Sequence, residues 1–216
     1  MTQQSATVSG ERTTKSKGIV WGAAAISLAA AIVFIAWICT RPIQGIPPGW
    51  SVLRGDPAQW NWSRGRIHAH TTTGDSILAS SDRYGNLTLS AVVATTNREA
   101  SIAIRLRDEN NGYFVTFVPA GTPWPWNGGG FLRLLKRDAG KETTLAEYKG
   151  MKGTQARMSA KMKVIARGPT IEVRLNGVKV LQALDTTFSG GRIGFRIYGW
   201  KDYPCDATFS NVRFHR

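Results

Sequence analysis

The stretch that decides the fold lies near the C-terminus, where residues 170–181 read Thr-Ile-Glu-Val-Arg-Leu-Asn-Gly-Val-Lys-Val-Leu. The Asn-Gly pair at 176–177 separates two runs of alternating apolar residues, and both residues tolerate the positive φ angles of a type I′ turn. The pattern therefore predicts a tight antiparallel hairpin with one apolar face and one charged face. The predicted facing pairs are Leu175 with Val178 and Val173 with Val180.

Apolar residues alternate again over residues 191–198, which predicts a third strand. Similar short runs, separated by turn residues and free of any long helical period, continue back to Trp50. They lie at 64–72, 75–81, 86–95, 100–107, 112–119, 131–138, 142–149, 159–167, 170–176, 178–184, 191–198 and 207–215. Short strands at this spacing predict one all-β domain over residues 50–216, with two packed antiparallel sheets. In the last run the apolar parity changes, and a bulge near Ser210 and Asn211 would restore it.

Composition and charge narrow the classes of partner. The chain has 216 residues, 8 of them Trp and 23 Gly, and a formal net charge of +14. The electrostatic field of so basic a chain attracts anionic lipids, acidic glycans or nucleic acid without specificity. Because no nucleic-acid-binding motif is present, no specific nucleic-acid partner is expected. The two cysteines, Cys39 and Cys205, lie in different environments, so no disulfide is expected and Cys205 is interpreted as a small packed side chain.

The N-terminal part has its own organisation. Residues 1–17 are polar and predict a disordered tail. Residues 18–39 carry no charge and are long enough to span a bilayer as a helix, so they predict an uncleaved transmembrane signal anchor. Residues 40–49 form a short Pro/Gly linker. The expected partner of this region is the lipid bilayer.

The charges beside the apolar segment predict its orientation. Three positive residues precede it closely, whereas only Arg41 follows it closely. This asymmetry places the tail in the cytoplasm and the C-terminal domain outside it, in a single-pass protein of the plasma (inner) membrane. A basic domain resting on the anionic inner leaflet remains the alternative.

Several short motifs carry a family resemblance that covers nearly the whole domain. They are Gly49-Trp50, Asp56, Gly65-Arg-Ile-His68, Tyr84-Gly-Asn-Leu-Thr-Leu89, Ser101-Ile-Ala-Ile-Arg105, Asn111-Gly-Tyr-Phe114, Ile171 to Val180, Gly191-Arg-Ile-Gly-Phe195 and Phe209-Ser-Asn-Val-Arg213. In this order they resemble concanavalin A-like jelly rolls, most closely the laminin G-like and 3-keto-disaccharide hydrolase-like branch. The resemblance implies two curved sheets with a carbohydrate site on the concave face.

The chain departs from that resemblance at positions that matter for catalysis. The Glu-x-Asp-x-x-Glu strand motif of the glucanase members is absent. Glu99-Ala-Ser-Ile stands where the hydrolase-like branch has Asn-Ser-Gly-Ile, and Tyr113-Phe-Val-Thr where it has a Tyr-Glu-x-Gln-like strand. No catalytic residue is therefore assigned from the sequence.

Acidic and histidine residues give no stronger signal for chemistry. Asp108-Glu109 are adjacent at a strand end and are interpreted as part of a loop, while Asp185 is interpreted as a turn residue that binds nearby backbone amides. His68 and His70 are two residues apart, so both project from one strand face, but no third ligand is close in sequence. They are interpreted as a polar strand face. Neither a metal nor a cofactor is predicted.

Arginine and aromatic residues supply the ligand-binding candidates. Arg105 and Arg107 alternate with apolar residues, so both are expected on the sheet face opposite to those apolar side chains. There Arg105, beside Tyr113, could bind a sugar. The alternative is that this sheet face is exposed to solvent and binds no ligand. Trp124 and Trp126 lie in a loop stiffened by Pro and rich in Gly, where they contact a ligand, cover the sandwich or touch the bilayer interface. The remaining candidates are Arg133, Trp200 and Tyr203.

Three functions are compatible with these observations. The first is a membrane-anchored, extracytoplasmic carbohydrate-binding module without catalysis, whose ligand is a polysaccharide or an anionic glycan. The second, which the resemblance implies, is a hydrolase or lyase of 3-keto-glycosides. The third is a structural sandwich that binds another protein.

Overall fold

The computed structural model describes residues 45–96, 98–122, 130–151 and 159–216. The predicted tail, the predicted anchor, residues 40–44 of the linker, and both Trp124 and Trp126 lie outside these residues. Among the helices that the structure describes, none is both long and apolar enough to cross a membrane. Residues 42–216 form one compact unit.

Strands make up almost all of the regular structure in the described residues. The one short 3-10 helix, η1, spans Pro57–Gln59. The strands are β1 (Trp50–Arg54), β2 (Trp60–Ser63), β3 (Arg66–Tyr84), β4 (Leu87–Thr95), β5 (Glu99–Asp108), β6 (Asn111–Val118), β7 (Gly130–Asp138), β8 (Lys141–Met151), β9 (Ala160–Arg167), β10 (Thr170–Leu175), β11 (Val178–Leu184) and β12 (Gly191–His215).

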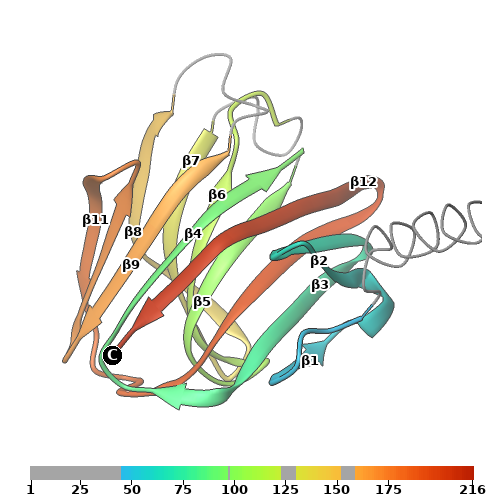
Figure 1. Ribbon diagram of the computed structural model, residues 1–216. Coiled ribbons are helices and arrows are strands. Elements are labelled where there is room, and N and C mark those ends of the chain that lie inside the picture. The colour runs from blue at the N-terminus through green and yellow to red at the C-terminus, as the bar shows by residue number, and fades with distance from the viewer. Residues whose placement is uncertain (1–44, 97, 123–129, 152–158) are drawn as a thin grey trace, which may run out of the picture. The chain divides into compact units, whose positions relative to one another are not determined.

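The strands form two antiparallel layers that share two long strands (Figure 1). Sheet I has the order β11-β10-β9-β4-β12-β3-β2, and sheet II has the order β1-β3-β12-β5-β6-β7-β8. The first half of β3 and the second half of β12 belong to sheet I, and their other halves belong to sheet II. This arrangement confirms the predicted all-β jelly-roll sandwich.

Two predicted breaks between strands are wrong. Residues 64–72 and 75–81 were expected as separate strands, as were 191–198 and 207–215, but each pair is one continuous strand. Each strand changes sheet at the expected break: β3 passes through Gly74, whose φ is 92°, and residues 201–204 leave the pairing of β12 with β3. The turn residues therefore mark bends, because a strand that crosses between layers must change direction.

The hairpin of β10 and β11 forms as predicted, with one shift in register. Asn176 and Gly177 have φ values of 51° and 90°, and Leu175 pairs with Val178. Val173 pairs with Leu181 instead of Val180, because a bulge follows Val173. The bulge expected near residues 210–211 is confirmed by a register shift between Ser210 and Arg213.

The main core lies between the two sheets and follows the predicted period of two. In β12, Ile193, Phe195 and Ile197 are all buried, and Phe195 packs on Phe209 with ring centroids 4.4 Å apart. Cys205 is a free, buried thiol within the same core, as expected. A smaller apolar cluster lies on the other face of sheet II. Its members are Ile77, Ala79, Ala103, Leu106, Phe114 and Leu135.

Candidate functional site

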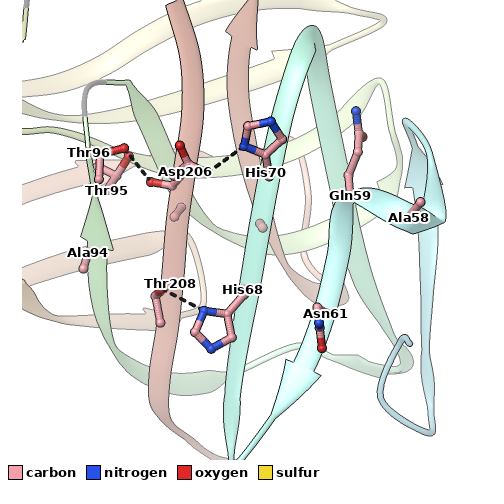
Figure 2. Close-up of a pocket in the computed structure, with 12 residues that line it drawn as sticks. Ala58, Gln59, Asn61, His68, His70, Ala94, Thr95, Thr96, Asp206 and Thr208 are labelled. Carbon is pink, nitrogen blue, oxygen red and sulfur yellow. Dashed lines mark hydrogen bonds and ion pairs between the residues drawn. The ribbon is translucent and has the colours of Figure 1, made fainter. Parts of the chain in front are cut away.

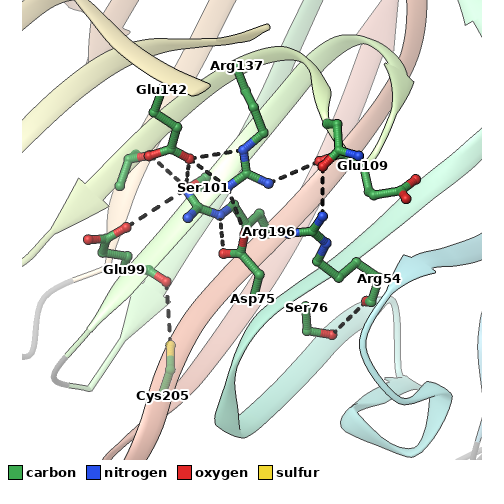
Figure 3. A network of polar contacts seen from close by, with 12 residues as sticks. Arg54, Asp75, Ser76, Glu99, Ser101, Glu109, Arg137, Glu142, Arg196 and Cys205 are labelled. Carbon is green, nitrogen blue, oxygen red and sulfur yellow. Dashed lines mark hydrogen bonds and ion pairs between the residues drawn. The ribbon is translucent and has the colours of Figure 1, made fainter. Parts of the chain in front are cut away.

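A network of ion pairs occupies the face of sheet II that points away from the main core (Figure 3). Arg196 lies on this face because its neighbours in β12, Phe195 and Ile197, point into the core. Its Nε donates to Asp75 Oδ1 at 2.7 Å, and Arg137 Nη2 donates to the other oxygen of Asp75, also at 2.7 Å. Three strands that are far apart in sequence, β3, β7 and β12, are thus joined across one sheet face.

Glu142 closes the network from β8. It accepts from Arg137 Nη2 at 2.6 Å and lies 3.3 Å from Arg196 Nη1. Arg137 also donates to the backbone oxygen of Glu109 at 3.0 Å. Because both arginines are only 4–5% exposed, their charges depend on these carboxylates, and the network is primarily a structural element.

Burial and pairing act in opposite directions on Asp75. Burial alone would raise the pKa of this carboxyl, but the charges and hydrogen bonds of Arg196 and Arg137 outweigh it, and the pKa lies below the ordinary value. Asp75 is therefore ionised wherever the domain is folded at neutral pH.

Glu99 lies at the edge of the same network and behaves differently. One of its oxygens is 3.8 Å from Arg196 Nη1. Burial raises the pKa of Glu99, the attraction of Arg196 offsets this only in part, and the charges of Glu142 and Asp75 raise it further. Two neighbouring carboxyl groups with pKa values moved in opposite directions, Asp75 and Glu99, are a pattern typical of acid–base sites.

Arg105 does not lie on an open sheet face, so this expectation is wrong. Its side chain is buried and donates to three backbone oxygens, those of Gly168 at 2.8 Å, Phe188 at 3.0 Å and Gly85 at 3.3 Å. The alternation in β5 is interrupted because Arg105 has a φ of 52°, and the pairing with β6 shifts after Ile104. Arg105 thus ties together three loops.

Tyr113 is also buried. Its hydroxyl donates to Asp185 Oδ1 at 2.6 Å and accepts from the backbone N–H of Phe188 at 3.1 Å. Burial and the hydrogen bond to Asp185 raise the pKa of Tyr113 to about 12. Asp185 also accepts from the backbone N–H of Thr187 at 2.8 Å, the turn chemistry expected for it. Ligand contact by Arg105 or Tyr113 stays a prediction, and both side chains have protein partners.

Arg133, Trp200 and Tyr203 are partly exposed. Arg133 donates to Glu147 at 2.5 Å and stacks over Phe131 with its guanidinium carbon 4.0 Å from the ring centre. Trp200 and Tyr203 pack edge to face, with centroids 5.8 Å apart. Arg98 stacks over both rings, at 4.6 Å and 4.1 Å. The structure therefore gathers Trp200 and Tyr203, and their contact with a ligand stays a prediction.

A groove of about 760 Å³ lies on the outer face of sheet I (Figure 2). Neighbouring strands β2, β3, β12 and β4 form its floor, and η1 forms one wall. Its polar side chains carry amide, imidazole, hydroxyl and carboxylate groups. The lining residues are Ala58, Gln59, Asn61, His68, Ala69, His70, Ala94, Thr95, Thr96, Asp206, Ala207 and Thr208.

The two histidines are held in place by β12. His70 Nδ1 lies 2.6 Å from Asp206 Oδ1, and His68 Nδ1 lies 3.3 Å from the hydroxyl of Thr208. The predicted common face of His68 and His70 is confirmed, and the second ring nitrogen of each is left for another partner. Within the described residues, no group of three or more His, Cys, Asp or Glu side chains could hold a metal ion.

Asn61 differs from the other groove residues. Its Oδ1 atom is buried and has no hydrogen-bond partner among the residues that the structure describes. A buried amide oxygen without a donor is costly, and an acceptor of this kind in a groove fits a ligand that brings a hydroxyl group.

Sequence reasoning missed Asn61, Asp206 and Thr208 as site residues. Asp206 and Thr208 have the same two-residue spacing as His68 and His70, which is the only signal that could have paired them. That signal was insufficient without the register of β3 against β12, in which Asp206 pairs with His70 and Thr208 with His68.

Comparisons with known proteins agree with this architecture. Among solved structures, the carbohydrate-binding module CBM66 from Bacillus subtilis superposes with a TM-score of 0.62 at 20% identity, covering 78% of this chain and 96% of that one. A β-glucanase from Bacillus licheniformis gives 0.59 at 13% identity, covering 81% and 96%. A putative glycosyl hydrolase from Parabacteroides distasonis gives 0.56 at 12% identity, covering 77% and 87%. At these identities the likeness shows the fold.

No curated protein matches the chain. A family model does match it, over residues 47–215, which is most of its length and almost all of the described structure. The chain therefore belongs to the family of the 3-keto-alpha-glucoside-1,2-lyase-like domain.

Proposed function

We propose that this domain binds carbohydrate in the groove of sheet I. The observation that carries the proposal is the buried, unpartnered Asn61 Oδ1 in a groove whose other polar side chains are suited to hydroxyl groups. The fold shared with a carbohydrate-binding module and the family membership support the same class of ligand.

The size and shape of the groove fit part of a glycan chain. Its volume of about 760 Å³ lies within the range of small-molecule sites, roughly 300–1,000 Å³. Alanines at 58 and 94 keep the space between the polar side chains open. An elongated, hydroxyl-rich ligand could lie across the strands without displacing a bulky side chain.

The chemistry of the lining favours a neutral sugar. Asp206 is the one acidic residue of the lining, which contains no Lys or Arg, and its carboxylate is already beside His70. Amides, hydroxyls and imidazoles both donate and accept hydrogen bonds, as a sugar hydroxyl does. Recognition at these residues would rest on hydrogen bonds rather than on ring stacking.

We further propose that the domain is carried outside the cytoplasm by the anchor at residues 18–39. The support is the length of this uncharged segment and the excess of positive residues before it. Protease added to intact spheroplasts is expected to digest the domain. Complete protection until the membrane is permeabilised would contradict this placement.

Filling the groove tests the binding site directly. In Ala94→Trp, the indole would project from β4 into the groove, and binding of the full chain to a neutral polysaccharide is expected to be lost. The measurement is a titration of the detergent-solubilised full chain with a panel of neutral and acidic glycans. Ser90→Trp is the matched control, because Ser90 lies on the same strand face, four residues away, and does not line this groove.

Each outcome of this titration is informative. Loss in Ala94→Trp with retention in Ser90→Trp would support the groove. Equal binding by both variants and by the wild-type chain would move the site elsewhere, and no binding of any glycan by the wild-type chain would refute the proposal.

A second function, elimination or hydrolysis of a 3-keto-glycoside, is favoured by Glu99. The ketone at C3 acidifies the proton at C2, so a base and an acid suffice to eliminate the group at C1. A buried carboxyl with a raised pKa beside other carboxylates is suited to such proton transfer. The test is incubation of the full chain with a 3-keto-α-glucoside, and the absence of any product would exclude this function for that substrate.

A further inference from the structure

A second groove, of about 430 Å³, lies at the opposite end of β3 from the histidines. It is formed by the turn from β3 to β4 and by the segment that leads into β12, at the end of the sandwich where the C-terminus lies (Figure 1). Two arginines, Arg83 and Arg107, line it together with Tyr84, Gly85 and residues 189–191.

A third arginine stands directly beside the groove. Arg192 follows Gly191 and pairs with Arg83 across the antiparallel ladder. Like charges at directly opposed positions destabilise a sheet, so this pair carries a cost that an anion would relieve.

Carboxylates do not neutralise these arginines within the protein. In the described parts of the chain, no ion pair joins Arg83, Arg107 or Arg192 to an acidic side chain. Arg107 instead lies over the ring of Phe188, with its guanidinium carbon 5.0 Å from the ring centre. The arginines of the Figure 3 network, by contrast, are matched by Asp75, Glu99 and Glu142.

The wall of the groove beside the arginines is bare backbone. A Cβ atom on Gly191 would lie 2.5 Å from the backbone of Arg105 and Leu106, and one on Gly190 would lie 3.2 Å from the oxygen of Tyr84. At Gly191 a side chain is therefore excluded, because the main chain of β5 packs directly against it. Glycines at 85, 190 and 191 leave this part of the groove lining without side chains.

We propose that this groove binds an oxyanion, namely the phosphate or sulfate ester group of a larger ligand. Guanidinium groups present planar pairs of donors that match two oxygens of such a group, and the two that line the groove, Arg83 and Arg107, supply the charge for a dianion. The source of the group is either a phosphorylated or sulfated sugar or the headgroup of an anionic lipid. This proposal does not depend on carbohydrate binding at the groove of sheet I.

The test uses the full chain in neutral detergent, titrated with inorganic phosphate, glucose 6-phosphate and glucose. Binding of phosphate and glucose 6-phosphate that depends on Arg83 and Arg107 is expected, whereas any binding of glucose, at the groove of sheet I, is expected to be the same in the arginine variant. Arg83→Gln/Arg107→Gln is expected to weaken binding by about a hundredfold, because each lost charge-assisted pair accounts for about a factor of ten. Both side chains are exposed, so the variant is expected to fold normally, which its melting temperature checks.

The matched control is Lys161→Gln/Lys163→Gln, which removes the same charge from exposed positions on β9. Retention of binding in this control, with loss in the arginine variant, supports a local site. Equal weakening in both variants would show attraction by net charge alone, and the absence of phosphate binding to the wild-type chain would equally overturn the proposal.

A second arm identifies the source of the anion. The full chain, reconstituted in phosphatidylcholine nanodiscs, is mixed with vesicles of phosphatidylcholine alone or with phosphatidylglycerol added. Arginine-dependent binding to the phosphatidylglycerol vesicles supports the site with a lipid headgroup as the source. Glucose 6-phosphate binding without vesicle binding supports it with a soluble ester as the source.

Discussion

Replacing Asp75 by Asn is expected to lower the free energy of unfolding by about 3–5 kcal/mol, the range for breaking a buried ion pair on one side. Two arginines that are almost fully buried, Arg137 and Arg196, donate to this one carboxylate, and an amide would leave their charges poorly compensated. Urea denaturation followed by tryptophan fluorescence measures the effect. Asp138→Asn is the control, because Asp138 is exposed at the end of β7 and should change stability by less than about 0.5 kcal/mol.

The effect of Asp75→Asn is expected to depend on pH in a defined direction. The pKa of Asp75 is lowered in the folded state, so its ionisation stabilises the domain above the unfolded pKa of about 3.9 and ceases to do so as the pH falls through the folded value. The difference between wild type and variant should therefore shrink below about pH 4. A constant difference from neutral to strongly acidic pH would contradict this role for the charge.

Glu99→Gln is expected to have the opposite effect on stability. The pKa of Glu99 is raised by burial, so its ionised form is penalised in the folded domain. The stability associated with its proton is present below the unfolded pKa and is lost as the pH rises through the folded value. The variant should therefore melt at a higher temperature than the wild-type chain at neutral pH, with no gain at acidic pH.

The same variant tests the catalytic alternative. If the chain turns over a 3-keto-glycoside through Glu99, Gln cannot transfer the proton and the rate should fall by about 10²–10⁴-fold. Glu142→Gln is a useful comparison, because Glu142 is more exposed and anchors Arg137. Undiminished turnover in Glu99→Gln would remove Glu99 from the reaction, and a lower melting temperature at neutral pH would contradict the stability argument.

Asp75→Asn and Glu99→Gln together distinguish a carboxylate that stabilises the fold from one that serves a function. Asp75 and Glu99 share Arg196, yet the protein holds the first as a stable anion and opposes ionisation of the second. Natural sites often keep groups that reduce stability when those groups serve binding or chemistry. A stabilising Glu99→Gln would therefore mark the edge of the network at Glu99 as the part with a function.

The local pattern of apolar and polar residues was sufficient to predict the fold, because alternate side chains of a strand point into the core. The Asn176-Gly177 turn, the core row Ile193, Phe195 and Ile197 and the bulge after Ser210 could all be predicted from spacing. The predictions from spacing fail where one residue interrupts the alternation of side chains along a strand. At Arg105 a positive φ turns the side chain into the protein.

The candidate sites depend on pairings that spacing does not reveal. Asp75 meets Arg196, and His70 meets Asp206, because β3 runs antiparallel to β12 in one particular register. The sequence gives the parity of each residue within its own strand, but not which residue lies opposite it. The histidines were recognised as one face, whereas the partners of that face became apparent only from the structure.

The long pairing of β3 with β12 also has a consequence for how the chain acquires its structure. Residues 66–84 find their partners in residues 191–210, so the central ladder of both sheets joins segments separated by about half of the chain. Contacts of such long range form slowly, because a large loop must close before they contribute any stability. On the ribosome, β3 has no β12 to pair with until residues 191–215 have been synthesised. The domain can therefore complete its fold only after β12 has been synthesised, and a chain truncated before β12 would lack the strand that joins its two layers.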